Sequence, residues 1–320
     1  KMAFPGSQDY FIMMDSLTFA VVNIPVSIIS ILINFFCVIC MFFPQHSRER
    51  LRQPLNVLLG TLVACNVILQ VCISVYTFME CGLLWSSNRV YGVIIEIILF
   101  SMRISVTSSL WLNVFYVCQI VPAECSVFIC LKRNIKFFIY SAMIADKIFF
   151  MFGFSEGIAL TVAETEFPHS YEYDSNATYT IQWDEVHAKI YTLYYIFIVN
   201  LWLRFSYLLL CLFVMLTSSC ATILYLRKHM KSMEASSSSL SSPCLQRQMR
   251  VTITGIIQTF LYFLCSVWIL IRDFVVFVLQ QITFDLNGRI CCSVVCLYSL
   301  GSTVNLCVGQ KIFRERAVEI

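Results

Sequence analysis

The sequence predicts an all-α membrane protein, a single bundle of seven transmembrane helices with its N-terminus outside. Three observations lead to this prediction. Hydrophobic residues make up 59% of the 320 residues and charged residues only 13%, whereas a soluble domain carries roughly 25% charged residues. Seven apolar stretches are long enough to cross a bilayer. Lys and Arg gather in the loops on one side of these stretches.

The seven predicted spans follow from the need for about 20 mostly apolar residues per transmembrane helix. They cover residues 17–43, 55–79, 92–121, 135–163, 191–226, 251–278 and 290–308. The fourth carries Asp146, Lys147 and Glu156, and the fifth is long enough to project beyond the bilayer. The first span lacks the pattern of a cleaved signal peptide, so we expect it to be retained. Residues 310–320 are expected to form a short amphipathic helix on the inner membrane surface.

Basic residues set the orientation, because loops rich in Lys and Arg face the cytoplasm. The basic side holds Arg48, Arg50, Arg52, Lys132, Arg133, Lys136, Arg227, Lys228, Lys231, Arg247, Arg250, Lys311, Arg314 and Arg316. The opposite side holds Lys1, Arg89, Lys189 and Arg289. The loop between the fourth and fifth spans lies on this outer side and contains the glycosylation sequon Asn176-Ala177-Thr178. We therefore expect Asn176 to carry a glycan.

Polar side chains inside the spans are the candidates for function, because ionisable groups are costly in a bilayer and usually face the bundle interior. Glu96 and Arg103 are two turns apart on one face of the third span. The candidates for a ligand cavity in the outer halves of the spans are Glu96, Ile98, Leu99, Met102, Arg103, Asn200, Arg204, Trp268 and Arg272. An apolar cavity with a few polar anchors is typical of small-molecule sites. Alternatively, the charged members pair among themselves or extend to the membrane interface.

Three asparagines inside the spans, Asn34, Asn66 and Asn305, are expected to form hydrogen bonds between helices. The sequence contains no metalloprotease, nucleophile-elbow or phosphate-loop motif and no zinc-ligand spacing. It therefore predicts neither an enzyme nor a cofactor or metal site. The net charge of +3 does not suggest nucleic-acid binding.

Four sequence blocks near the predicted inner face are considered as one pattern, because their order and spacing along the chain are informative. They are Asn113-Val114-Phe115-Tyr116 with Gln119-Ile120, Val127 to Ile135, His229-Met230-Lys231-Ser232-Met233, and Gly301-Ser302 with Lys311. In order and spacing, and with Asn34, Pro243 and Tyr262, they resemble the bitter (type 2) taste receptors along the whole chain. As in those receptors, residues 164–190 contain no cysteine. Most rhodopsin-like receptors, vomeronasal type 1 receptors included, have one there.

The chain departs from the pattern of these receptors at several positions. Asn66 stands where those receptors usually have Arg, Gln119 where they have Lys, Gly301 where they have His, and Cys211 where they often have Pro. Thr107 occupies the position of their usual Trp, and this chain has Trp111 one helical turn below it. These departures indicate a divergent, non-mammalian member.

The resemblance implies a rhodopsin-like G-protein-coupled receptor in the cell membrane. It implies a small organic, bitter agonist and adds Cys291 to the pocket positions. It also implies a heterotrimeric G protein of the gustducin or inhibitory type, facing Tyr116, Lys132, Arg133, His229 and Met233. Two alternatives remain: another chemosensory receptor of the vomeronasal or odorant-like kind, and a transporter or channel. Against a transporter, the chain has no inverted repeat.

Overall fold

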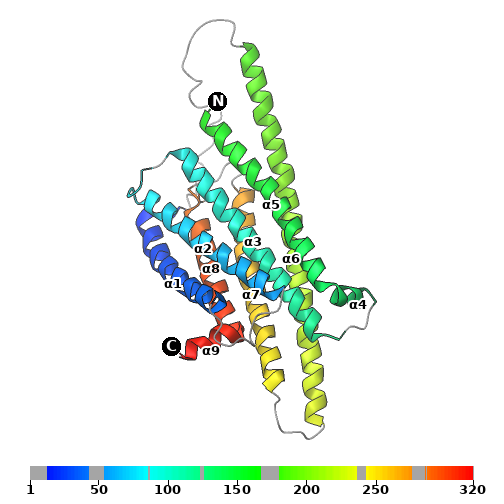
Figure 1. Cartoon of the computed structure of the whole chain (residues 1–320). Coiled ribbons are helices and arrows are strands. Elements are labelled where there is room, and N and C mark those ends of the chain that lie inside the picture. Colours follow the sequence, from blue (N-terminus) through cyan, green and yellow to red (C-terminus); the bar gives the residue numbers. More distant parts are fainter. Residues whose placement is uncertain are drawn as a thin grey trace, which may run out of the picture.

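The computed structural model describes residues 13–42, 54–85, 87–122, 126–166, 180–235, 243–275, 285 and 287–319 (Figure 1). Within these residues the chain forms helices and no strand. In chain order the helices are α1 (Ser16–Phe42), α2 (Leu55–Glu80), α3 (Asn88–Ile120), α4 (Ser126–Arg133), α5 (Ile135–Glu166), α6 (Thr180–Ala235), α7 (Pro243–Phe274), α8 (Arg289–Gly309) and α9 (Lys311–Glu319). Seven of them are long and apolar enough to cross a membrane. The all-α fold class with seven spanning helices is thus confirmed.

Two helices extend well beyond the predicted spans. Helix α6 runs from Thr180 to Ala235 and projects beyond the bundle at both ends (Figure 1). Helix α7 begins at Pro243 rather than near residue 251, and Pro is favoured at the first position of a helix. The predicted spans ended where apolar residues ended, whereas a helix continues through polar residues outside the bilayer. The short helix α4, within the second inner loop, was not predicted.

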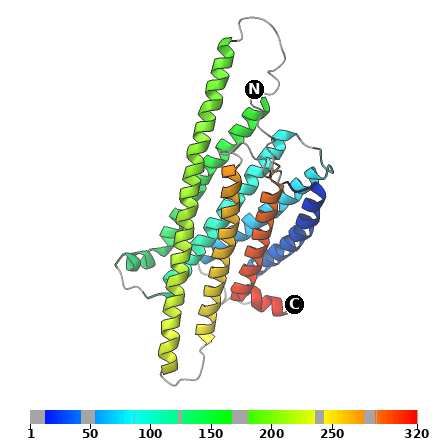
Figure 2. The same cartoon turned by 180° about the vertical axis from the view of Figure 1, so that it is seen from behind.

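Helix α3 lies at the centre of the bundle, where it packs against α2, α5, α6, α7 and α8. Helix α1 packs against α2 and α8, so that the first and the last spanning helices are neighbours. Seen from behind, α6, α7 and α8 stand side by side (Figure 2). Any cavity in the interior is therefore lined mainly by α3 and by the helices around it.

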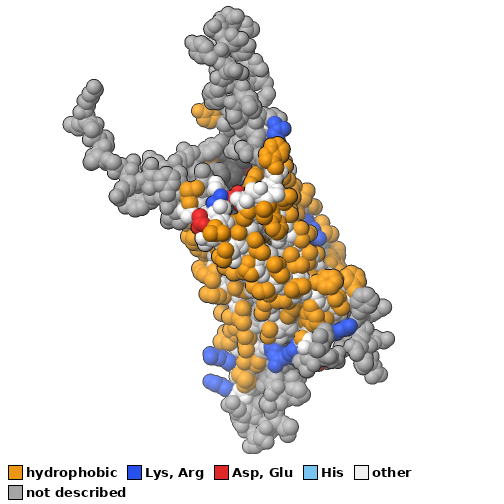
Figure 3. All heavy atoms as spheres, turned by 90° about the vertical axis from the view of Figure 1, so that its left-hand side faces the viewer, with side chains coloured by type: hydrophobic (Ala, Val, Ile, Leu, Met, Phe, Trp, Pro, Cys, Tyr) orange, Lys and Arg blue, Asp and Glu red, His pale blue; other side chains and the backbone are white. Residues whose placement is uncertain are grey.

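The surface of the bundle suits a lipid environment. Large apolar side chains face outward on several helices, such as Leu32 at 63% exposed and Phe213 at 65%. Figure 3 shows hydrophobic side chains over the middle of one face, with Lys and Arg mostly near its lower end. Helices can leave such an apolar band uncovered only in lipid, because lipid chains are as apolar as the side chains they touch. By the positive-inside rule, the basic end is cytoplasmic.

A hydrogen-bonded group of side chains holds α1, α2, α3 and α8 together inside the membrane. The Nδ2 atoms of Asn34 and Asn66 each donate to Thr303 Oγ1 at 3.1 Å. Ser105 Oγ donates to Asn66 Oδ1 at 3.0 Å. The predicted interhelical role of these two asparagines is confirmed. Asn66, which departs from the family's usual Arg, therefore joins three helices without introducing a charge.

Candidate functional site

A buried group of charged side chains lies between α3, α5 and α6 in the outer half of the bundle. Arg204 Nη2 of α6 lies 3.6 Å from Glu156 Oε2 of α5, and the two side chains are only 10% and 4% exposed. Asn200 Nδ2 donates to the same carboxylate oxygen. The charges of Glu96 and Arg103 on α3 also act on Glu156. These five residues, which we call the outer charge cluster, come from three helices, and the ion pair of Arg204 with Glu156 links α6 to α5.

Two glycines of α5 make room for this cluster. A Cβ atom added at Gly157 would lie 2.4 Å from Cδ of Glu96. One added at Gly153 would lie 3.3 Å from Nδ2 of Asn200 and 3.8 Å from Nη1 of Arg103. The two glycines are one turn apart and share a helix face. Side chains of α3 and α6 therefore occupy space that exists only because α5 carries no side chain there.

A separate small cavity lies between α3, α7 and α8. Its volume is about 10 Å³, room for about one water molecule, and it is lined by Ile95, Ile98, Leu99, Arg272, Gly288, Cys291, Cys292 and Val295. The described lining residues are apolar except for Arg272, whose Nη2 lies 3.7 Å from where a Cβ of Gly288 would be. One cation among apolar walls is the composition typical of a small-molecule site, although the cavity must widen to hold such a molecule.

The start of α8 forms the outer rim of this cavity. Buried Asp285 accepts hydrogen bonds from the backbone N–H groups of Ile290 at 2.9 Å and Cys291 at 2.8 Å, which satisfies donors that the first turn of a helix leaves unpaired. Arg289 Nε donates to Glu80 Oε2 at 2.6 Å, tying α8 to α2. These contacts fix the position of Cys291 in the cavity wall.

Asp146 of α5 is a second buried carboxylate, and it joins α3 to α6. Trp111 Nε1 donates to Asp146 Oδ2 at 2.7 Å, and the Tyr207 hydroxyl donates to Oδ1 at 2.5 Å. The Tyr207 ring also stacks on Phe149, with the ring centroids 5.3 Å apart. The three helices that carry the outer charge cluster are thus joined a second time, further into the membrane.

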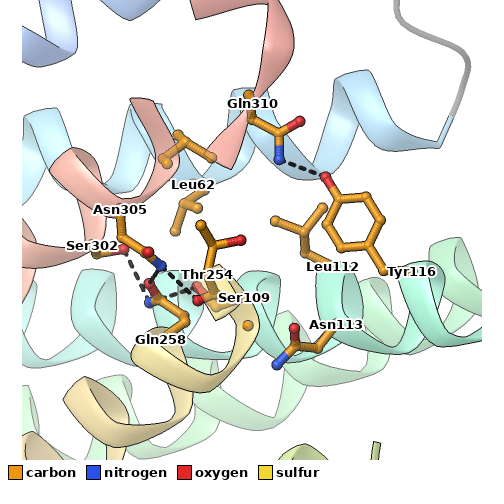
Figure 4. Close-up of a pocket in the computed structure, with 12 residues that line it drawn as sticks. Leu62, Ser109, Leu112, Asn113, Tyr116, Thr254, Gln258, Ser302, Asn305 and Gln310 are labelled. Carbon is orange, nitrogen blue, oxygen red and sulfur yellow. Dashed lines mark hydrogen bonds between the residues drawn. The ribbon is translucent and has the colours of Figure 1, made fainter. Parts of the chain in front are cut away.

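The inner half of the bundle holds a polar cavity of about 30 Å³, lined by Leu62, Ser109, Leu112, Asn113, Tyr116, Thr254, Gly255, Gln258, Ser302, Asn305, Leu306 and Gln310. Gln258 of α7 is central to it (Figure 4). Its Nε2 donates to Ser302 Oγ at 3.1 Å and to Ser109 Oγ at 3.2 Å. Asn305 Nδ2 donates to Gln258 Oε1 at 3.2 Å and to the Thr254 carbonyl at 2.8 Å. The inner ends of α3, α7 and α8 are thereby linked, which confirms the interhelical role predicted for Asn305.

The comparison with known families identifies the chain. The sequence model of the family described as Taste receptor protein (TAS2R) matches residues 12–320. The chain belongs to the TAS2R family. No curated protein matches the chain. Family membership and the seven spanning helices make it a taste receptor of the G-protein-coupled class and a multi-pass protein of the cell membrane. The resemblance predicted from the sequence blocks is confirmed.

The structure divides the predicted pocket residues of this TAS2R chain into two sets. Ile98, Leu99, Arg272 and Cys291 line the outer cavity. Glu96, Arg103, Asn200 and Arg204 belong instead to the outer charge cluster. Met102 lies in the hydrophobic core, 2% exposed, and Trp268 is half-buried on α7. Arg204 forms an ion pair, but with Glu156, which is not a member of the predicted set, so this contact is not the pairing among the predicted charged residues that the alternative described.

The residues predicted to face the G protein differ in how far they are exposed. Lys132 and Arg133 are exposed at the end of α4. Tyr116 is half-buried, and its hydroxyl accepts from Gln310 Nε2 at 2.5 Å (Figure 4). His229 and Met233 belong to α6, but their side chains are outside the described part of the chain, and so is Asn176.

Two site residues were seen in the sequence but given no role. Asp146 and Glu156 were noted as charges in the fourth span, and each is the acceptor around which neighbouring helices gather. The cost of a carboxylate in an apolar span was the available signal. It was strengthened by Gly153, which lies one turn before Glu156 on the same face of the helix.

Proposed function

We propose that this TAS2R chain detects small organic, bitter agonists and activates a heterotrimeric G protein of the gustducin or inhibitory type. The agonist binds at the outer cavity between α3, α7 and α8, which must widen to admit it because its volume is only about 10 Å³ in this structure. The observation that carries this proposal is the wall of that cavity, where Arg272 is the one charged residue among the described lining residues, which are otherwise apolar side chains and glycine. Such a site favours an apolar molecule with a carbonyl, hydroxyl or anionic group directed at the guanidinium.

The proposal assigns signalling to the inner, basic end. Lys132 and Arg133 are exposed there, and the polar cavity around Gln258 links the inner ends of α3, α7 and α8. An agonist shifts this arrangement only in so far as it prefers the active state. The rearrangement of these inner ends then presents the G-protein surface.

The test is an agonist screen in cells that carry a G protein with broad receptor specificity. One panel contains chemically distinct bitter compounds, and a second contains amines and pheromone-like volatiles. We expect responses to the bitter panel that disappear without the G protein. Responses confined to the second panel would contradict the proposed ligand class, and uptake or current without the G protein would contradict coupling.

Replacing Arg272 with glutamine is expected to lower agonist potency at least about tenfold, because a hydrogen bond to a charged group contributes about 1.5–3 kcal/mol. Concentration–response curves are compared at equal surface expression. Arg89→Gln is the matched control, since Arg89 is exposed at the start of α3 and does not line the cavity. Unchanged potency of Arg272→Gln across several agonists would remove Arg272 from the site.

The outward-facing loop is expected to carry a glycan at Asn176, a residue outside the described part of the chain. Glycosidase treatment of receptor from eukaryotic cells should increase its electrophoretic mobility. Asn176→Gln should show the same increase without treatment. A glycosidase-insensitive wild-type receptor would contradict this prediction, and an antibody that reaches the loop only after permeabilisation would contradict the orientation.

A further inference from the structure

The membrane-facing surface of α7 and α8 carries an apolar groove in the cytoplasmic half of the bundle. Its volume is about 860 Å³. The walls are formed mainly by Ile253, Ile257 and Leu261 from α7 and by Leu297, Val304 and Val308 from α8. Several of these side chains are about half exposed, among them Ile253 at 50% and Val308 at 55%. In a spanning bundle, a groove at this depth faces lipid chains rather than water.

The depth of the groove depends on Gly301. This residue lies among the lining residues, and a Cβ atom added to it would lie only 3.1 Å from Cδ1 of Leu261. Any side chain at this position would therefore press against α7 and fill the groove. The groove therefore remains open at a place where two packed helices usually present a continuous row of side chains.

The cytoplasmic end of the groove carries a cation. Arg250 lines the groove and is exposed. It lies on the same face of α7 as Ile253, Ile257 and Leu261, because these residues follow at helical spacing. From residue 250 to residue 261 the helix rises about 16 Å. The flexible side chains of Met230 and Met249 line the same groove, and methionine adapts to irregular apolar surfaces.

We propose that this groove is a binding site for an anionic phospholipid of the cytoplasmic leaflet. One acyl chain lies along the groove between α7 and α8, and the phosphate of the head group pairs with the Arg250 guanidinium. The charges are complementary, because that leaflet is rich in anionic lipid and arginine binds phosphate through two hydrogen bonds. Phosphatidylserine is the representative lipid.

The site adjoins the inner polar cavity. Thr254 and Asn305 line both the groove and that cavity, and Asn305 Nδ2 donates to the Thr254 carbonyl at 2.8 Å. Thr254 and Asn305 therefore separate the bound lipid from the hydrogen bonds around Gln258. A lipid that prefers the observed spacing of α7 and α8 therefore stabilises it. This effect on signalling rests on the proposed function, whereas lipid binding does not.

The binding test uses the full chain in phosphatidylcholine nanodiscs that contain a small fraction of phosphatidylserine with a photoreactive acyl chain. After irradiation, peptide mapping should place the label mainly on residues 253–261 of α7 and 297–308 of α8. Val304→Trp should abolish that label by filling the groove. The matched control is Leu32→Trp, at a lipid-facing position of α1 that is 63% exposed. If Val304→Trp does not fold, Val308→Phe tests the same wall.

The head-group test compares Arg250→Gln with Lys136→Gln, an exposed basic residue at the inner end of α5. Arg250→Gln should lower labelling by the phosphatidylserine probe about fivefold, from roughly 1 kcal/mol per basic residue near an anionic surface. Labelling by a phosphatidylcholine probe should not change. Label spread evenly over all lipid-facing helices would mean annular lipid only and would overturn the site. Equal labelling by the two probes would overturn the anionic preference. Neither outcome depends on an agonist response.

Discussion

Replacing Glu156 with alanine is expected to remove most of the receptor from the cell surface. The Glu156 side chain is 4% exposed and lies 3.6 Å from Arg204 Nη2, and it accepts a hydrogen bond from Asn200. Removing one partner of a buried ion pair leaves the other charge uncompensated and costs about 3–5 kcal/mol. A folded domain has only about 5–15 kcal/mol of stability. The loss is therefore comparable to the whole margin for folding.

Surface labelling of tagged receptor measures this effect, normalised to total protein. Glu156→Gln should retain more surface receptor than Glu156→Ala, because the amide oxygen still accepts from Asn200. Glu156→Ala combined with Arg204→Met should recover part of the loss, since no unpaired cation remains. Glu315→Ala, at an exposed position of α9, is the control for removing a carboxylate. Wild-type surface expression of Glu156→Ala would show that the cluster does not support the fold.

The fold was predictable because the bilayer imposes a length and a composition on each span. The inner-face blocks also led to the correct family. The ends of α6 were not predictable in this way, since residues 180–190 are polar and continue the helix outside the apolar segment. Hydropathy marks where a helix crosses lipid, not where its backbone hydrogen bonds end.

The candidate site was only partly predictable, because periodicity shows which residues share a face but not which helix that face meets. Glu96 and Arg103 were correctly placed on one face of α3. That this face meets Gly153 and Gly157 of α5 depends on tertiary packing. Arg103 was predicted to line the ligand cavity, whereas its place in the outer charge cluster now leads us to expect that its substitution affects folding first. Arg272 keeps its predicted place in the cavity wall.

Asp146 also shows that the sequence does not reveal which residues of other helices a buried side chain contacts. Its two donors, Trp111 and Tyr207, are 35 and 61 residues away in the sequence. Nothing in the spacing of the fourth span indicates either partner. Trp111 stands one turn below the position where the family usually has its Trp, and in this chain the indole donates to Asp146. The departure from the family pattern and the unassigned carboxylate are therefore two parts of one contact.

Replacing Asp146 with leucine is expected to lower the melting temperature of the purified receptor and its surface expression. The carboxylate is 8% exposed, and its loss leaves the Trp111 indole N–H and the Tyr207 hydroxyl without their acceptor. A buried donor left unsatisfied costs about 1–3 kcal/mol, so the two donors together cost about 2–6 kcal/mol. Asp146→Asn should be milder, because the amide oxygen can still accept one of the two hydrogen bonds. Lys147→Leu, at the exposed neighbouring position, is the control for removing a charge from the same turn.

A triple variant separates the hydrogen bonds from the bulk of the side chains. Asp146→Leu combined with Trp111→Phe and Tyr207→Phe removes the acceptor and both donors, so no buried polar group is left unpaired. Replacing all partners by apolar groups is often nearly neutral, whereas removing one partner is not. The triple variant should therefore melt at a higher temperature than Asp146→Leu alone, although it carries two more substitutions. If the three changes instead add, the Trp111–Asp146–Tyr207 contacts do not act as a unit, and α3, α5 and α6 are held together by the outer charge cluster and apolar packing alone.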